Sequence, residues 1–199
     1  VLPAAMLTYL AGIKLRLGAC HQNPYHLLTH WISDSPADIL IRHEVRRQLD
    51  LVSKIGAYPA SERITLHVPW LAQQAVDELL EQNQIDCDTR WIVLHPGATA
   101  ASRRYPIEHF EEVVRRLAHL GIKIVVTGQS EELHWAERLV AAAPQAVVSL
   151  CGKLNLPQFA ALLQRCPLLV SNNTGAIHVA AGTGTRVVCL YAQTNPQHT

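Results

Sequence analysis

From residue 91 onward, short runs of consecutive apolar residues alternate with longer segments whose apolar residues recur every three or four positions. The first run, 91–95, has four apolar residues followed by His95. The segment 106–120 places its apolar residues on one helical stripe with Glu and Arg outside it. The same patterns predict strands at 122–127, 147–150, 168–171 and 186–191, and helices at 130–143, 156–166 and 174–181. Apolar strands that alternate with helices are typical of a parallel sheet covered on both faces. We therefore predict a doubly wound, Rossmann-like α/β domain.

The first 85 residues are less regular. The pattern predicts a strand within 13–19, helices at 45–55 and 71–80, and a loop at 33–38. Proline and serine interrupt the pattern between 56 and 69, which suggests a boundary there. We find neither an internal repeat nor a low-complexity segment.

The apolar stretch 1–13 is interrupted by Thr8 and followed by Lys14. It is shorter than the roughly 20 residues that a spanning helix needs, and no basic region precedes it, as a secretory signal would require. We therefore expect a cytoplasmic protein. Because the chain begins at Val1 and stops shortly after a predicted strand, we also expect it to be an excerpt of a longer protein.

Composition narrows the class of protein. Of the 199 residues, 49% are hydrophobic and 17% are charged, which is enough apolar material for a buried core and too little charge for a disordered chain. Lys plus Arg number 17 and Asp plus Glu 16, a formal net charge of +1. Non-specific binding to nucleic acid relies on a positive field, so we expect no nucleic-acid partner and only local anion sites.

Several familiar sites are not indicated. The five cysteines are scattered without a CxxC pair and are interpreted as small buried hydrophobic residues. His26 and His30 are four apart and could share a helix face, but neither an HExxH motif nor a third ligand accompanies them, so no metal site is predicted. The sequence also has no GxxxxGK[ST] loop, GxGxxG motif or GxSxG elbow.

In doubly wound sheets, ligands bind at the carboxyl ends of the strands. The loop after the first predicted strand carries groups suited to an anion there. Gly97 would let a ligand approach the backbone, and Thr99 and Ser102 supply hydroxyl groups. Either Arg103 or Arg104 supplies a positive charge suited to a phosphate. The competing interpretation is a polar turn in which Ser102 caps the next helix.

The loop after the strand at 168–171 enters a short helix through Asn173, Thr174 and Gly175. The unpaired N–H groups and positive dipole end of a helix start favour an anion. Capping explains Asn173 or Thr174. It does not explain why Gly175, which weakens a helix, comes next, unless a ligand must approach the backbone there. His178, about one turn further on, either faces that ligand or packs in the core.

A third loop, at 128–132, places Glu131 and Glu132 near a helix start. These carboxylates either complement the helix dipole, or one of them accepts hydrogen bonds from sugar hydroxyls.

Two blocks together resemble glycosyltransferase family 9, the bacterial heptosyltransferases of lipopolysaccharide core synthesis. Residues 170–181, 184–188 and 194–196 resemble the family signature. Residues 95–98 and 103–106 resemble the family's other donor-site loop. The resemblance covers 91–199 well, and residues 1–69 look like the last part of the family's N-terminal domain.

The resemblance implies the C-terminal half of a two-domain GT-B fold with a fragment of the N-terminal domain. Residues 1–69 would be the remnant of the acceptor-binding domain, 70–90 a linker and connecting helix, and 91–199 a donor-binding domain that is incomplete at its C-terminus.

The resemblance further implies an inverting, metal-independent glycosyltransferase without a cofactor. It would transfer heptose or a related sugar from a nucleotide-diphosphate donor such as ADP-heptose to a lipopolysaccharide-type glycolipid acceptor. Such an acceptor leaves open a peripheral contact with the inner face of the cytoplasmic membrane. The alternative is a catalytically inactive nucleotide-binding or scaffold module of GT-B type.

Site roles follow from the resemblance residue by residue. The donor diphosphate would be bound by Thr99, Arg103, Asn173, Thr174, Gly175 and His178, and the nucleoside ribose by Glu132. The family usually has Asp where Asn173 stands and Lys where Arg103 stands, departures that bear on the donor sugar more than on the diphosphate. The family's catalytic base would precede Val1, so no residue here is assigned that role and the isolated chain is expected to be inactive.

Overall fold

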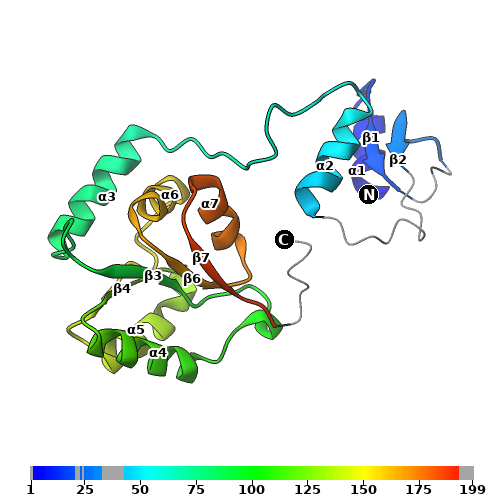
Figure 1. The fold of residues 1–199 in the computed structure, drawn as a ribbon. Coiled ribbons are helices and arrows are strands. Elements are labelled where there is room, and N and C mark those ends of the chain that lie inside the picture. Colours follow the sequence, from blue (N-terminus) through cyan, green and yellow to red (C-terminus); the bar gives the residue numbers. More distant parts are fainter. Residues whose placement is uncertain (1, 21–22, 24, 33–42, 193–199) are drawn as a thin grey trace. The chain divides into compact units, whose positions relative to one another are not determined.

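The computed structural model describes residues 2–20, 23, 25–32 and 43–192 (Figure 1). The described residues up to 62 form one compact unit, and those from 63 to 192 form a second. The segment at 64–68 belongs to the second unit: the Leu66 amide donates a 3.0 Å hydrogen bond to the Gly182 carbonyl.

The first unit contains α1 (Leu2–Leu10), β1 (Leu17–Ala19), β2 (His30–Ile32) and α2 (Glu44–Ser53). β1 pairs with β2 in parallel, with Leu17 opposite His30. The helix predicted at 45–55 is confirmed as α2. The loop predicted at 33–38 lies outside the described residues.

The two histidines of the first unit do not share a helix. His30 is the first residue of strand β2, and His26 has a left-handed backbone with φ of 50°. The possibility that the two histidines share a helix face is therefore excluded, because one lies in a loop and the other in a strand. Within the described residues, His, Cys, Asp and Glu side chains form no group of three that could hold a metal ion.

The second unit is built on a five-stranded parallel sheet in the order β5-β4-β3-β6-β7. Its strands are β3 (Trp91–His95), β4 (Lys123–Val126), β5 (Val147–Ser149), β6 (Leu169–Asn172) and β7 (Val187–Leu190). The chain proceeds outward from β3 to β5, then returns to place β6 on the other side of β3. The predicted doubly wound parallel α/β sheet is confirmed.

Helices cover both faces of this sheet (Figure 1). They are α3 (Trp70–Gln82), α4 (Ile107–His119), α5 (Leu133–Ala142), α6 (Leu156–Arg165) and α7 (Gly175–Thr183). Each predicted helix of this region is found within a few residues of its expected bounds. Gly121, just beyond α4, has φ of 70°, a left-handed conformation that glycine adopts without steric cost.

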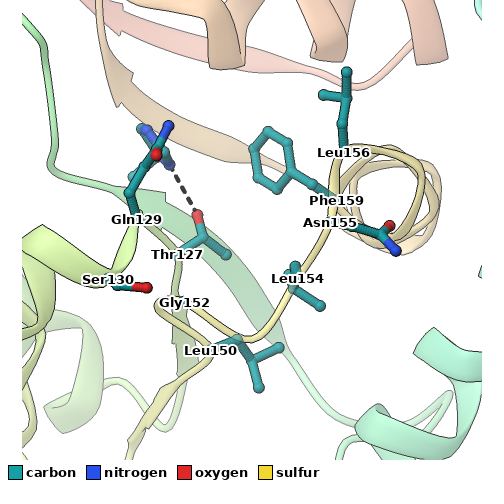
Figure 2. Close-up of a pocket in the computed structure, with 11 residues that line it drawn as sticks. Thr127, Gln129, Ser130, Leu150, Gly152, Leu154, Asn155, Leu156 and Phe159 are labelled. Carbon is teal, nitrogen blue, oxygen red and sulfur yellow. Dashed lines mark hydrogen bonds between the residues drawn. The ribbon is translucent and has the colours of Figure 1, made fainter.

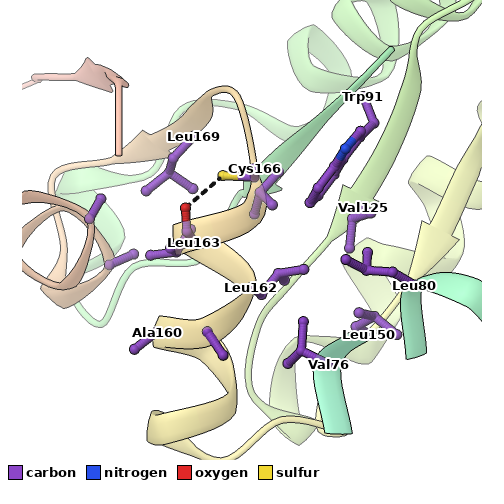
Figure 3. Close-up of a cluster of buried hydrophobic side chains, with 14 of the residues drawn as sticks. Val76, Leu80, Trp91, Val125, Leu150, Ala160, Leu162, Leu163, Cys166 and Leu169 are labelled. Atoms are coloured by element: carbon purple, nitrogen blue, oxygen red, sulfur yellow. Dashed lines mark hydrogen bonds between the residues drawn. The ribbon is translucent and has the colours of Figure 1, made fainter. Parts of the chain in front are cut away.

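Side chains of the central strand alternate between two cores, because successive residues of a strand point to opposite faces. Trp91 and Val93 pack with buried residues of α3 and α6, and Figure 3 shows Trp91 and Val125 beside Leu162 of α6. Ile92 and Leu94 pack with residues of α4 and α5. The uninterrupted apolar pattern of β3 is thus the consequence of burial on both sides.

The cysteines only partly match the expected burial. Cys151 and Cys166 are buried, and burial raises the pKa of their thiols to about 11 and about 12. Cys20 and Cys189 are partly buried, whereas Cys87 is exposed. The prediction of burial is therefore wrong for Cys87, which lies in the loop between α3 and β3.

No helix among the described residues combines the length and the apolar character needed to cross a membrane.

Candidate functional site

The sheet topology selects one place for a ligand site. The strand order changes direction between β3 and β6, which are neighbours in the sheet. In doubly wound sheets the carboxyl ends of the strands form a crevice at such a switch point. The loops that leave β3 and β6 there are the two for which the sequence predicts anion binding.

Asn172, the last residue of β6, joins these two loops. Its side chain is fully buried, its Nδ2 donates a 2.7 Å hydrogen bond to the Pro96 carbonyl, and its Oδ1 accepts a 3.1 Å bond from the Tyr105 amide. A single amide side chain therefore holds both ends of the loop from 96 to 105 beside the start of α7. The partners lie 67 and 76 residues away in sequence, so no local pattern indicates this role.

The structure distinguishes between the two arginines of the first loop. The Arg104 guanidinium donates from Nε to the Ala98 carbonyl at 2.7 Å and from Nη2 to the Thr99 carbonyl at 3.3 Å. It also lies 4.9 Å from the centroid of the Trp135 ring, in a cation–π contact. Arg104 therefore holds the loop together, a role that the sequence interpretation missed.

Arg103 and Thr99 remain open to solvent. Both residues are exposed, and for neither side chain does the described part of the chain provide a hydrogen bond or an ion pair. A charge and a hydroxyl group that the fold does not use are available to a ligand.

Ser102 does not cap the following helix. It lies in the 3₁₀ turn η2 (Ala101–Arg103), and α4 begins only at Ile107, with Pro106 preceding it and no side-chain cap. The competing interpretation of Ser102 as a helix cap is therefore wrong, because residues 103–106 separate it from the start of α4.

Residues of the second loop form the N-terminus of α7. The Thr174 side chain caps the helix by accepting a 3.2 Å hydrogen bond from the Ala176 amide. Asn173 is buried, and its amide donates to the Leu190 carbonyl at 3.1 Å. Gly175 is exposed, and a Cβ built on it would have no neighbour within 4 Å. His178 is exposed on the same helix.

Glu132 fills space expected for a ligand. Its carboxylate lies so close to Gly97 that a Cβ at that position would overlap it, and a Cβ at Gly128 would come 2.7 Å from its Oε2. Oε2 also accepts a 2.9 Å hydrogen bond from the Gln129 amide. In this structure the two glycines leave room for the Glu132 carboxylate, and the approach of a ligand to the Gly97 backbone stays a prediction.

A pocket of about 310 Å³ opens beside Gly128, at the carboxyl ends of β3 to β5. Figure 2 shows polar residues Thr127, Gln129 and Ser130 on one side and Leu154, Leu156 and Phe159 on the other. The pocket therefore offers an apolar wall opposite a polar one.

His95 also lines this pocket. Its Nδ1 lies 3.1 Å from the Thr127 hydroxyl, and its ring centroid lies 5.7 Å from that of Phe159. Burial lowers the pKa of His95 below its ordinary value of 6.5, and the negative charge of Glu132 only partly opposes that shift. The lowered pKa favours the neutral imidazole, which donates a hydrogen bond from one ring nitrogen and accepts one at the other.

The structure thus connects all three loops. Asn172 ties the loop carrying Thr99 and Arg103 to the helix start carrying Thr174 and Gly175, and the contact with Gly97 brings in Glu132. His178 is not brought into contact with the other site residues by any described interaction. The arrangement offers an exposed cation, hydroxyl groups and helix N–H groups beside a half-apolar pocket.

Comparison with known proteins gives consistent results. The model of the family described as "Glycosyltransferase family 9 (heptosyltransferase)" matches residues 1–199. Lipooligosaccharide heptosyltransferase 2 of Haemophilus influenzae is 26% identical over all of this chain and 60% of its own length. Lipopolysaccharide heptosyltransferase 1 of Escherichia coli is 31% identical over 78% of this chain and 46% of its own length.

Solved structures show the same fold. A family 9 glycosyltransferase from Veillonella parvula superposes with a TM-score of 0.84 at 22% identity, covering 98% of this chain and 55% of its own. The E. coli ADP-heptose LPS heptosyltransferase II gives a TM-score of 0.79 at 23% identity, covering all of this chain and 62% of its own. The chain thus spans 46% to 62% of the length of these relatives.

Proposed function

Because this chain belongs to glycosyltransferase family 9, we propose that its second unit binds the nucleoside diphosphate of a sugar donor for a glycosyltransferase reaction. The whole protein would transfer heptose or a related sugar to a lipopolysaccharide-type glycolipid. The E. coli relative acts on ADP-heptose, so ADP-heptose is the donor we propose first.

The observation that carries the proposal is the buried Asn172 bridge between the two loops at the switch point. It holds the exposed cation of Arg103 on a loop that is fastened beside the N-terminus of α7. A diphosphate needs a cation and several N–H or hydroxyl donors around its oxygens. Arg103, Thr99, Thr174 and Gly175 are the groups available for this purpose.

In the proposed reaction, the bond between the sugar and the diphosphate breaks, and the leaving diphosphate gains negative charge. Donors arranged in advance around that charge lower the barrier. We propose that Arg103 and the α7 N–H groups supply this stabilisation without a metal ion, and that transfer inverts the anomeric configuration. Asn173 and His178 would lie beside the same diphosphate.

For the nucleoside, we propose the pocket beside Gly128. Its volume and its mixed lining suit a base and a ribose. Glu132, whose Oε2 also lies near Gly128, would accept hydrogen bonds from the ribose hydroxyls. A glycolipid acceptor would bring the protein to the surface of the membrane that holds that lipid.

A thermal-shift panel of ADP, UDP and GDP against the 199-residue chain tests the proposal. A ligand that binds only the folded state raises the melting temperature. We expect ADP to stabilise the chain most. If none of the three nucleotides stabilises it at millimolar concentration, donor binding by this unit is contradicted. If ADP binds but the complete protein transfers no sugar, the chain is instead part of an inactive nucleotide-binding module.

A further inference from the structure

We propose that Asn172 is a positioning residue for the diphosphate, which sets where Arg103 and Thr99 stand relative to the start of α7. This inference rests on the proposed function, because it names how the proposed site is held in shape. Asn172 itself would touch no ligand: its side chain is fully buried and both ends of its amide are used within the protein.

The hydrogen bonds of Asn172 constrain the loop at both of its ends. Nδ2 fixes the Pro96 carbonyl, directly after β3, and Oδ1 fixes the Tyr105 amide, directly before the proline that precedes α4. Between these two points lie the exposed residues Thr99 and Arg103. With both ends fixed, fewer conformations are available to the loop, so a ligand that orders it loses less conformational entropy on binding.

Asn172 is also rigid with respect to the second half of the site. It is the last residue of β6, and it is separated from the helix cap Thr174 by Asn173 alone. Its own backbone is held in the sheet by pairing with Leu190 of β7. Loss of the Asn172 side chain would therefore free the 96–105 loop to move relative to the start of α7.

Inside the loop, Arg104 provides the complementary constraint. Its guanidinium binds the Ala98 and Thr99 carbonyls and lies over Trp135, so the side chain of the neighbouring Arg103 is the one left for a ligand. Asn172 thus sets the position of the loop and Arg104 its internal shape.

The chemistry of the side chain explains why an amide is required. Asn172 must donate to a carbonyl and accept from an N–H at the same time, and an uncharged amide does both. Aspartate would accept from the Tyr105 amide but could not donate to the Pro96 carbonyl when ionised. It would also bring a negative charge beside a site for an anion.

The test is a double-mutant cycle on ADP binding, measured by isothermal titration calorimetry on the 199-residue chain. Asn172→Ala and Arg103→Ala are made singly and together. Because small misplacements of binding groups are costly, Asn172→Ala should weaken ADP binding by about tenfold or more. If Asn172 acts by placing Arg103, the same substitution made in the Arg103→Ala background should weaken binding by less than about threefold.

Controls separate positioning from loss of fold. Far-UV circular dichroism and thermal melting establish that each variant is folded at the titration temperature, and Asn172→Ser, smaller and uncharged, replaces Asn172→Ala if that variant does not fold. Asn83→Ala is the matched control. It removes the hydrogen bond that the Asn83 side-chain amide donates to the Leu79 carbonyl at the end of α3, and it should leave ADP affinity unchanged.

Two results would overturn the inference: unchanged ADP affinity in Asn172→Ala, or a loss that is the same in both backgrounds. Failure of the wild-type chain to bind ADP is a distinguishable result, since it contradicts the proposed function itself.

Discussion

The carboxylate of Glu132 occupies the space that glycine leaves open at Gly97, so closely that any Cβ there would overlap it. This contact joins the loops that follow β3 and β4. The absence of a side chain at Gly97 therefore makes room for the Glu132 carboxylate.

Replacing Gly97 with alanine should therefore displace Glu132. The overlapping atoms are the flexible end of a side chain, so we expect the free energy of unfolding to fall by less than the about 1–3 kcal/mol that overpacking a core costs. ADP affinity should fall, because Glu132 is the proposed ribose acceptor. Urea unfolding and titration calorimetry measure the two effects.

Glu132→Ala provides the control for this substitution. If Gly97→Ala acts through Glu132, adding it to Glu132→Ala should change ADP affinity little further. A full additional loss of affinity would show that Gly97 matters for another reason.

Arg103→Ala should weaken ADP binding by about 1–3 kcal/mol, the range for losing a hydrogen bond to a charged group. Its thermal stability should stay unchanged, because the described part of the fold makes no use of this side chain. Arg116→Ala, which removes an exposed charge from the end of α4, is the matched control and should not affect ADP binding. Equal affinities in Arg103→Ala and wild type would refute this assignment.

Arg104→Ala, unlike Arg103→Ala, should lower the stability of the fold. Loss of two bonds to backbone carbonyls and of the contact with Trp135 should lower the free energy of unfolding by about 1–2 kcal/mol. A lower urea midpoint with an unchanged denaturant slope would report this loss. Trp135→Leu, which removes only the cation–π contact, should cost less. An unaltered midpoint in Arg104→Ala would contradict the structural role.

The pH dependence of stability should carry a contribution from His95. Burial lowers its pKa in the folded state below the ordinary value of 6.5, so below that pH the unfolded chain binds a proton that the folded chain resists. The free energy of unfolding should thus be fully retained above pH 6.5 and should fall on acidification. Urea unfolding of wild type and His95→Gln between pH 5 and 8 tests this: the variant should lose less stability on acidification. Parallel profiles would count against the assignment.

Much of the fold follows from local sequence. The stripe of apolar residues at 106–120 predicts a helix, and α4 spans Ile107–His119. The apolar run at 91–95 coincides with β3. In both cases the signal is the spacing of neighbouring residues, which local periodicity captures.

The first unit shows where periodicity fails. α1 has only one buried residue, Ala5, and its apolar residues form no single stripe, so the apolar periodicity does not predict this helix. β2 has three residues, too few to show an alternating pattern.

At the site, the residues that supply exposed groups were predictable and those that arrange them were not. Thr174 at a helix start and an arginine in a loop have local signals. Asn172 bonds to Tyr105 and Pro96, and Glu132 contacts Gly97, across long stretches of sequence. Only the folded arrangement of the sheet brings such partners together.

The choice between Arg103 and Arg104 could not be predicted either, because it depends on the backbone carbonyls that the Arg104 side chain reaches in the folded loop.

The most direct test of the central claim is the mapping of ADP onto the 199-residue chain by ¹H–¹⁵N nuclear magnetic resonance. We predict that the amides of Thr99, Arg103, Thr174 and Gly175 shift as ADP is added, together with those of Gly128 and Gln129 at the nucleoside pocket. A second pocket lies near Trp91, the first residue of β3, and is also lined by Asp77 and Arg165. The amides around this pocket should not shift. Shifts confined to the pocket near Trp91, or no shifts at saturating ADP, would contradict the account.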